Sequence, residues 1–555
     1  MPSILWVWHV ISQSITLLND SLFGSKYFIY SLRILGSQNY FPNGMKNLFF
    51  LLLFILSASY ASAQFTDRYW CFGDSAGIDF RNLNNPIPGE SVLRSRGTCA
   101  SICDSSGNLL FYCGDPHVDL WLQPGTNYFG MILNKDHQIM EGGDSLVGTL
   151  WYREMIIIPN PGNTQQFYVF MAGITPTTNP GLYYCLVDLS YNGGLGKVIQ
   201  KNIQLQTFPV CDGLAAVKHG NGRDWWLLFK EYNPGGSSFN YLEYLVTPSG
   251  ISNLITQTIG LPTNTNALRL DFSKDGKRLS MVDNFNDLEL FDFDRCSGIL
   301  SNPNPIHASS IGGMFWSSTF SPDDTKLYMT EIYTGPSDSL SYLYQFDLNY
   351  IGGIFNSIDT LAMYRKPIVA GFLQRGPDDN IYLSSYLEIN DCEFFYLYCD
   401  TSYYQENMNI GVIHDPNVLG AGCNFQPFSF YLGGHRAYIG LPNNPNYELG
   451  ADTLSLCDTI QTSVSEPKDK GRQPKLSVYY SSSWRTAFIN ASGIQGKEIQ
   501  LCITDASGKI IYQEKAMAQD GFYTKDLALP NLAPGIYYAT LFTDSGRVST
   551  KFIVM

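Results

Sequence analysis

The chain has 555 residues, more than one compact hydrophobic core usually holds, so its length predicts several domains or one large repeat domain with an appendage. Aromatic residues make up 14% of it and charged residues only 15%, and it contains 50 glycines and 28 prolines, a balance typical of many short strands and turns. Its formal charge of −14 opposes a surface that binds nucleic-acid phosphates, so nucleic acid is not an expected partner.

The first element in chain order is a leader. Residues 45–63 combine a positively charged start, the apolar run Leu48–Leu56 and a closing pattern of small residues, which together predict a signal peptide cleaved between Ala63 and Gln64. We interpret residues 1–44 as a non-native N-terminal extension. The apolar run is shorter than the ~20 residues that a membrane-spanning helix needs, so we expect no transmembrane segment.

Residues 64–445 repeat one short phrase, in which an apolar strand enters a turn rich in Gly, Asp, Asn or Pro and leaves as a strand rich in large apolar residues. Such turns join antiparallel strands, because Gly, Asn and Asp tolerate the positive φ of tight hairpins. A period of about 54 residues with several strands per unit is typical of a β-propeller, and this stretch has room for about seven units. The turn markers are Gly107, Gly162, Gly222, Gly276, Asp324 and Asp379.

We therefore predict an all-β fold with an about seven-bladed β-propeller over residues 64–445. Pairing of Arg68–Phe72 with C-terminal strands near Phe428–Tyr438 would close the ring and remove the exposed edges of an open arc. An array of β-sandwiches is the alternative fold.

Three phrases of this stretch, Gly181–Val198, Val217–Gly222 and Gly440–Asn443, resemble those of a large set of secreted propeller proteins of Bacteroidota. The resemblance implies a propeller fold and an extracellular location. It does not imply a reaction.

The composition changes after the predicted propeller. Residues 446–474 are polar and have no sustained apolar period, which predicts a linker. Residues 475–555 contain alternating strands and turn signals, which predicts a small Ig-like β-sandwich.

This last stretch resembles the type A C-terminal sorting domain of the type IX secretion system. The likeness rests on Asp505–Lys509, Leu532–Tyr538 and Lys551–Met555, while the Tyr-Pro-Asn-Pro phrase that usually opens the family is replaced by Val478–Ser483. It implies that the outer-membrane secretion machinery is a partner, and that the protein passes the periplasm and ends secreted or at the cell surface. A generic Ig-like binding or spacer domain is the alternative. The residues expected to carry the sorting motif are Asp505, Gly508, Gly535, Tyr537 and Lys551.

All twelve cysteines follow the leader in a chain bound for an oxidising compartment, so disulfides are expected. Their spacing shows no zinc-binding pattern. A hairpin folded about Ser106 would place Cys99 opposite Cys113, which makes this pair the candidate disulfide. Two buried thiols are the alternative.

The sequence contains no recognisable catalytic motif, and we assign no catalytic residue, cofactor or metal site. We favour a secreted or cell-surface binding protein for a glycan or protein ligand over the alternative, a hydrolase or lyase acting on extracellular polysaccharide. Binding would use aromatic side chains for stacking, and the candidates are Trp70, Trp121, Trp151, Trp225, Trp226 and Trp316. Catalysis would need carboxylates that converge at a propeller mouth, drawn from Asp115, Asp119, Glu154, Asp212 and Glu231.

Two further motifs are expected to be structural. His219 lies in a turn phrase, without a second histidine nearby in the sequence. The acidic loop from Asp283 to Asp287 lacks the glycine and the distal glutamate of a calcium-binding loop.

Overall fold

The computed structural model does not describe the predicted leader or its cleavage site between Ala63 and Gln64. It describes residues 66–114, 128–148, 152–173, 180–285, 287–307, 313–332, 340–387, 403–453, 455, 457–458, 475–494, 498–506, 509–519, 521–543 and 546–554.

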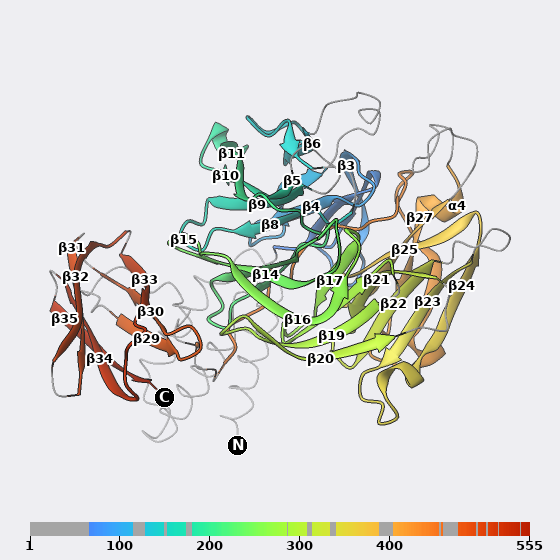
Figure 1. Ribbon diagram of the computed structural model, residues 1–555. Helices are drawn as coiled ribbons and strands as arrows, with labels where there is room; N and C mark the ends of the chain where they lie inside the picture. Colours follow the sequence, from blue (N-terminus) through green and yellow to red (C-terminus); the bar gives the residue numbers. More distant parts are fainter. Residues whose placement is uncertain are drawn as a thin grey trace, which may run out of the picture. The chain divides into compact units, whose positions relative to one another are not determined.

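The region from Tyr69 to Tyr431 forms seven antiparallel sheets in chain order, each made from consecutive strands (Figure 1). The first three sheets contain β1 (Tyr69–Phe72), β2 (Asp74–Asp79) and β3 (Ile87–Arg94); β4 (Cys99–Cys103), β5 (Leu109–Gly114), β6 (Tyr128–Asn134) and β7 (Leu146–Val147); and β8 (Met155–Pro159), β9 (Gln166–Gly173), β10 (Gly181–Asp188) and β11 (Lys197–Gln206).

Four further sheets, of four or five strands each, complete this region. They contain β12 (Ala215–Lys218), β13 (Trp225–Lys230), β14 (Ser238–Thr247), β15 (Gly250–Ile251) and β16 (Ile255–Thr263); β17 (Leu268–Phe272), β18 (Arg278–Asp283), β19 (Asp287–Asp294) and β20 (Ile299–His307); β21 (Met314–Phe320), β22 (Lys326–Ile332), β23 (Leu340–Asp347) and β24 (Asp359–Arg365); and β25 (Ile368–Arg375), β26 (Ile381–Leu387), β27 (Asn409–Ile413) and β28 (Phe425–Tyr431). Short helical turns interrupt the connections at η2 (Asn192–Gly194), η3 (Ile354–Ser357), α4 (Gln405–Met408) and η4 (Gly420–Cys423).

The seven sheets are the blades of a propeller, which confirms the predicted fold class. The strands β4, β8, β12, β17, β21 and β25 each contact the next in this series, so they form the inner wall of the ring. All six turn markers lie in the turn that follows one of these inner strands, at equivalent positions in successive blades. Gly276 has a φ of 72° and Asp324 a φ of 57°, the left-handed conformation that explains why the repeat uses Gly or Asp there.

The acidic turn markers also connect neighbouring blades. The Asp324 carboxylate accepts the backbone N–H groups of Lys274 at 2.7 Å and Asp275 at 3.1 Å from the turn of the preceding blade. The Lys274 ammonium in turn contacts the Asp379 carboxylate at 2.6 Å, and Asp379 lies in the blade that follows the blade of Asp324. One residue type thus satisfies both the local turn and the packing between blades.

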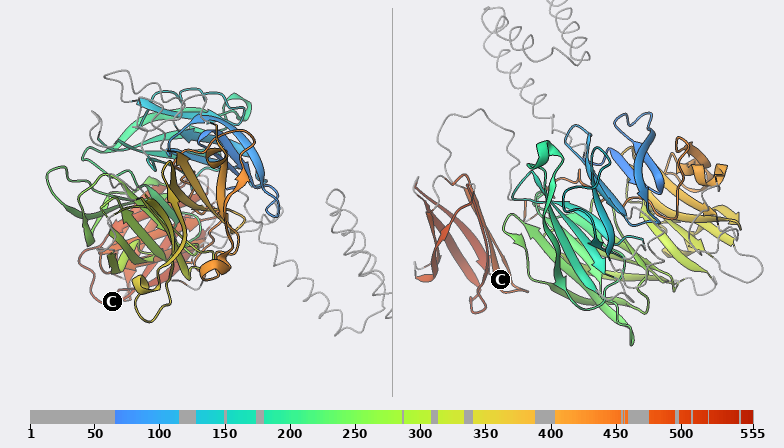
Figure 2. Two further views of the ribbon diagram at one scale, coloured as in Figure 1. Left: turned by 90° about the vertical axis from the view of Figure 1, so that its right-hand side faces the viewer. Right: turned by 90° about the horizontal axis from the view of Figure 1, so that it is seen from above.

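The ring closes where the first and last sheets lie side by side, blue beside orange in Figures 1 and 2. Trp70 and Phe80 of the first blade pack edge-on against Tyr382 of the last, with ring centroids 5.5 and 5.4 Å away. The predicted pairing of C-terminal strands with Arg68–Phe72 is not what the structure has. Instead one antiparallel bridge joins Asp74 and Arg436, whose buried side chains also form an ion pair.

The chain after this bridge enters the propeller axis, where it stands in for the missing fourth strand of the three-stranded first blade. Gly440 donates its N–H to the Arg96 carbonyl, and Asn443 donates its N–H to that of Cys99. The Asn443 amide side chain donates to the Met155 carbonyl at 3.1 Å and to the Leu214 carbonyl at 2.9 Å. We call residues 436–447 the axial segment; it uses side-chain amides because it contacts several blades at once and cannot form a regular ladder with any of them.

The C-terminal strands form two antiparallel sheets. They are β29 (Lys475–Ser481), β30 (Thr486–Ser492) and β33 (Phe522–Ala528) in one sheet, and β31 (Glu498–Asp505), β32 (Ile510–Met517), β34 (Gly535–Thr543) and β35 (Gly546–Val554) in the other. The two sheets bury a common core that includes Ile489, Leu501, Leu541 and Phe552, as the predicted Ig-like sandwich requires.

The predicted pairing of Cys99 with Cys113 differs from the observed register. A bulge between Ile102 and Cys103 shifts the hairpin by one residue, so Cys99 lies opposite Gly114 and Cys113 opposite Ala100. Their side chains therefore belong to two different hydrophobic clusters and do not form the predicted disulfide. Within the described residues the structure has a disulfide between Cys296 and Cys457 instead.

Candidate functional site

The two faces of the propeller differ in their connections. Each inner strand ends in a tight turn, and we call the face that holds these turns the turn face. The inner strands begin at the opposite face, which also receives the connections between second and third strands, such as those from Gly114 to Tyr128 and from Leu387 to Asn409. We call it the loop face; long connections that converge on one end of a rigid scaffold are a usual place for binding.

Arginines and aromatic rings gather where the inner strands begin, near the axis. The Arg269 guanidinium lies 4.5 Å from the ring centroid of Tyr152, 4.6 Å from that of Phe372 and 5.7 Å from that of Trp316. The rings also contact one another, and Tyr152 and Trp316 have centroids 5.0 Å apart. We call this group the axial cluster, and its members are Arg96, Tyr152, Arg153, Arg269, Trp316 and Phe372.

Each arginine of the axial cluster is held by a residue of another blade. Arg96 donates to the Tyr152 hydroxyl at 2.6 Å, and its guanidinium lies 4.7 Å from that ring centroid. Arg153 donates to the Gln374 side chain at 2.9 Å. Arg269 forms a buried ion pair with Asp212 at 2.8 Å. The cluster therefore gathers three guanidinium groups in a chain whose net charge is strongly negative.

Burial dominates the electrostatics of this cluster. It lowers the pKa of Arg153 because the guanidinium has lost most of its water, and the nearby charge of Arg269 acts in the same direction. It raises the pKa of Asp212 in spite of the opposing attraction of Arg269. The lowered pKa of Arg153 means that a bound anion beside this guanidinium would stabilise its charged form. The raised pKa of Asp212 means that a second negative charge beside this carboxylate would be unfavourable.

Several polar atoms of the cluster have no hydrogen-bond partner within the described part of the chain. They are Nε of Arg153, Nε of Arg269 and Nε1 of Trp316, all buried, together with Oδ2 of Asp212. A buried donor without a partner is costly, by about 1–3 kcal/mol each, so three of them in one cluster indicate an acceptor that the described residues do not supply. A carboxylate or a water network would satisfy these donors.

The turn-face side of the axis is nearly filled. Behind Arg153 lies a cavity of about 40 Å³, which is bounded by Asp271, Arg375 and the axial segment residues Asn443 and Asn444. Such a volume holds no more than a few water molecules. Within the described residues, this cavity is therefore too small to admit a larger ligand to the axial cluster from the turn-face side.

The described carboxylates among those proposed for catalysis each have local partners. Glu154 and Asp212 are both buried, and Asp212 is committed to Arg269. Glu231 lies elsewhere and accepts hydrogen bonds from Ser238 and Asn240, each at 2.7 Å. Asp115 and Asp119 lie outside the described residues.

The tryptophans proposed for stacking are divided between core and site. Trp70, Trp225 and Trp226 are buried in the cores of blades. Trp316 belongs to the axial cluster and is partly buried, so it alone of the described candidates keeps accessible surface there. Trp121 and Trp151 lie outside the described residues.

Sequence reasoning missed the three arginines because each is isolated in the chain. Arg96 and Arg153 come just before the inner strands β4 and β8, and Arg269 is the second residue of β17. Only the propeller topology brings these three positions together. A basic residue that recurs at the beginning of inner strands is the signal that would have identified them.

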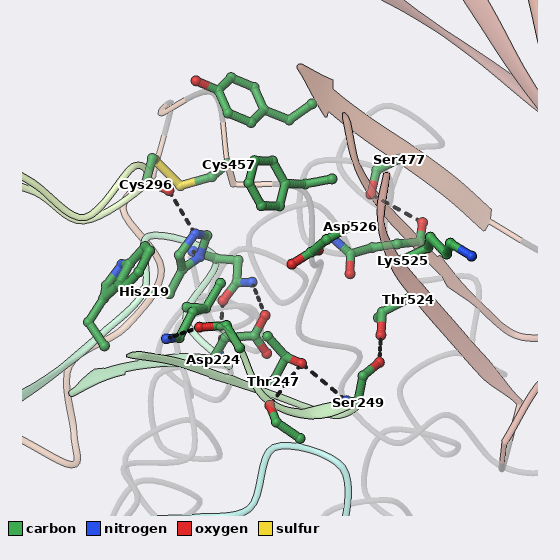
Figure 3. A pocket seen from close by; sticks show the side chains of 18 of the residues that line it. His219, Asp224, Thr247, Ser249, Cys296, Cys457, Ser477, Thr524, Lys525 and Asp526 are labelled. Atoms are coloured by element: carbon green, nitrogen blue, oxygen red, sulfur yellow. Dashed lines mark hydrogen bonds between the residues drawn. A yellow bond between two sulfur atoms is a disulfide. The ribbon is translucent and has the colours of Figure 1, made fainter. Parts of the chain in front are cut away.

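His219 has a structural role on the turn face. Its Nδ1 accepts the N–H of Asn221 at 3.1 Å, so its Nε2 carries the proton that it shares with the Cys296 carbonyl at 2.9 Å (Figure 3). Burial lowers its pKa, which favours this neutral form. The ring thus supports the Cys296–Cys457 disulfide.

The acidic loop of the fifth blade is bound by its own backbone. One oxygen of the Asp283 carboxylate accepts the N–H groups of Phe285 at 2.9 Å and Asp287 at 3.2 Å. Across the described ranges, no group of three His, Cys, Asp or Glu side chains is arranged to hold a metal ion.

The sorting-motif residues have local roles in the C-terminal domain. Asp505 accepts the N–H of Lys509 at 3.0 Å and closes the β31–β32 turn, and Tyr537 is buried with its hydroxyl on the Ala533 carbonyl at 2.9 Å. Gly535 begins β34 with a φ outside the left-handed region and with room for a Cβ atom. Lys551 is exposed on β35, and Gly508 lies outside the described residues.

Comparison with known proteins identifies the C-terminal domain. Residues 485–555 match the family of secretion system C-terminal sorting domains. No curated protein matches the chain. No helix in the described part of the chain has the length and apolar character to cross a membrane.

Solved structures that are similar to the chain include a β-propeller domain. The β-propeller domain of Cps50 (Swd1) from Myceliophteria thermophila is 11% identical, with a TM-score of 0.31, over 57% of this chain and 93% of that one. A quinonprotein alcohol dehydrogenase-like protein from Bacteroides thetaiotaomicron is 10% identical, with a TM-score of 0.32, over 63% and 73%. At these values neither protein informs on activity. The fold and the sorting domain together make the chain a secreted or cell-surface β-propeller protein that carries a type IX secretion system sorting domain at its C-terminus.

Proposed function

We propose that the exported propeller is an extracellular binding protein whose axial cluster receives a carboxylate group of an acidic glycan. The observation that carries this proposal is the set of three buried N–H donors, on Arg153, Arg269 and Trp316, that have no acceptor among the described residues. The proposal selects the glycan over the protein ligand, and binding over catalysis.

The chemistry of the cluster favours a uronic acid over a neutral sugar. Guanidinium groups bind carboxylates through charge-assisted hydrogen bonds, which are about twice as strong as neutral ones. Aromatic rings such as that of Trp316 supply apolar area against the carbon face of a sugar. A neutral sugar would use the rings and leave the N–H groups of Arg153 and Arg269 without a charged acceptor.

The geometry also limits how much of a ligand can enter. Arg153, Arg269 and Tyr152 are buried, and the space behind Arg153 holds only water-sized groups. A single carboxylate group is therefore the part of the ligand that would enter, and the sugar ring and the rest of a polymer would lie over the loop face.

Binding of defined oligosaccharides tests the proposal. Isothermal titration of the full chain with oligogalacturonate and oligomannuronate should show binding, whereas neutral oligosaccharides of equal length should bind at least tenfold more weakly. Trp316→Ala should weaken uronate binding at least tenfold, since stacking on one ring is worth about 1–2 kcal/mol.

A matched control distinguishes binding at the axial cluster from nonspecific binding to exposed aromatic rings. Tyr350→Ala removes an aromatic ring that is 48% exposed in the connection between β23 and β24, on the turn face, and should leave binding unchanged. Equal affinity for neutral and acidic glycans, or binding only to protein ligands, would contradict the proposal. Release of new reducing ends or unsaturated sugars during the titration would instead support the polysaccharide hydrolase or lyase.

A further inference from the structure

One face of the sorting domain has an unusual pattern. Along β34, Tyr537, Ala539 and Leu541 point into the core, whereas Ile536, Tyr538 and Phe542 point outward and are 41–45% exposed. An antiparallel sheet with one buried face normally places polar residues on the other. The outward row of β34 is instead mainly apolar, which indicates a surface that another molecule covers.

The neighbouring strand β35 extends this surface and adds positive charge. Ile553 lies directly opposite Ile536, so two large apolar side chains form a cross-strand pair. Lys551 lies opposite Tyr538, and Arg547 lies opposite Phe542. We call these six residues the sorting face; they are Ile536, Tyr538, Phe542, Arg547, Lys551 and Ile553.

Positive charge also predominates over the rest of this side of the sheet. Lys515 of β32 is exposed and pairs with Gln500, whose side chain points outward. Among the described outward positions of the sheet, Glu498 is the one carboxylate. This side is therefore cationic on a chain with a net charge of −14.

We propose that the sorting face is the surface by which the outer-membrane secretion machinery recognises this protein, and that it docks onto an acidic surface with exposed apolar side chains. Residues 485–555 match a family of sorting domains, so export requires a contact between this domain and the machinery. The inner face of the same sheet is buried in the sandwich core and is not available for that contact.

Charge and side-chain type both favour the secretion machinery as the partner of the sorting face. Two copies of the sorting face would bring Lys551 and Arg547 of each against those of the other, and like charges at an interface are costly. Tyr and Arg are the residue types that most often dominate binding energy at protein interfaces. The cations would steer the encounter with an acidic partner, and the apolar row would hold it.

Export of full-chain variants from the native host tests the proposal. The paired change Tyr538→Thr with Phe542→Thr keeps strand propensity but removes the aromatic row. The paired change Arg547→Glu with Lys551→Glu reverses the charge. Each pair should lower the amount of protein in the medium and at the surface at least tenfold, with the propeller accumulating in the periplasm.

The matched control is Phe522→Thr, which removes a 46% exposed aromatic ring from β33 in the other sheet of the same domain. It should be exported at the level of the unmodified chain. The melting temperature of each purified full-length variant distinguishes loss of recognition from loss of folding. If both pairs melt within about 3 °C of the unmodified chain and are exported normally, the proposal is wrong.

Crosslinking in living cells identifies the occupant even where a variant folds poorly. A photoreactive residue in place of Ser549, which is exposed beside Lys551 on β35, should form an adduct with an outer-membrane subunit of the secretion machinery. The same residue in place of Phe522 should not. An adduct with lipopolysaccharide or with a second copy of this chain, in place of the machinery, would overturn the assignment.

Discussion

The two ends of the propeller axis are built from different chemistry. At the turn-face end, the buried ring of Tyr447 in the axial segment packs against Trp225 at the start of β13, with ring centroids 5.9 Å apart, and a disulfide fixes the chain that follows. At the loop-face end, the axial cluster leaves buried donors of Arg153 and Arg269 without acceptors. The turn-face end therefore serves stability, and we propose that the loop-face end serves recognition.

The largest effect should come from the ion pair that closes the ring. Arg436→Met leaves the buried Asp74 carboxylate without its main partner, although Arg94 remains 3.5 Å away. Removing one partner of a buried pair typically costs 3–5 kcal/mol, so we expect the free energy of unfolding to fall by about 4 kcal/mol. Urea unfolding followed by tryptophan fluorescence measures this. A change below about 1 kcal/mol would mean that the axial segment does not close the ring.

The disulfide should have the next largest effect. Cys296 and Cys457 are 161 residues apart, so their bond constrains a long loop of the unfolded chain. Cys457→Ser should lower the free energy of unfolding by about 3 kcal/mol under oxidising conditions. In the presence of dithiothreitol the variant and the unmodified chain should unfold together. Cys185→Ser, which removes a buried thiol outside this disulfide, serves as the control and should keep its sensitivity to the reductant.

The Asp67 carboxyl should make the stability of the fold depend on pH. Burial raises the pKa of this carboxyl to about 7, against the opposing hydrogen bonds from Asn444 and Trp70. A carboxyl with a higher pKa in the folded than in the unfolded chain stabilises the fold at low pH and loses that contribution as the pH rises through the folded pKa. The unmodified chain should therefore lose stability between about pH 4 and pH 7.

Asp67→Asn isolates this contribution, because its side-chain oxygen can accept the same two hydrogen bonds without charge. The variant should be about 2 kcal/mol more stable than the unmodified chain at pH 8 and nearly equal to it at pH 4. Thermal unfolding at the two pH values measures the difference. A variant that is less stable at both pH values would show that burial does not raise the pKa of the Asp67 carboxyl in the folded protein.

Much of the fold could be predicted because its signals are local. The turn markers Gly276 and Asp324 occupy equivalent turns, since each turn needs a residue that tolerates positive φ whatever surrounds it. The predicted pairing of Cys99 with Cys113 failed for a reason that is local but not visible in the sequence, namely a bulge that shifts the register by one residue.

The axial cluster and the axial segment could not be predicted because they are assembled from distant parts of the chain. Arg269 meets Tyr152 and Phe372 only after three blades have taken their places in the ring. Asn443 appears in the sequence as part of a polar turn, and its contacts with Met155 and Leu214 depend on how the ring closes. Side chains that share an axis leave no common spacing in the sequence.

The most direct test of the separation between the two ends compares Trp316→Ala with Tyr447→Ala. Each variant is measured twice, by urea unfolding and by titration with oligogalacturonate. Trp316→Ala should weaken binding at least tenfold and change the free energy of unfolding by less than about 1 kcal/mol, because its ring is only partly buried. Tyr447→Ala should lower the free energy of unfolding by about 3 kcal/mol, because it removes a buried ring and leaves the Ile157 carbonyl without its donor, and should bind as the unmodified chain does. If both variants lose stability and binding in parallel, the two ends of the axis do not have separate roles.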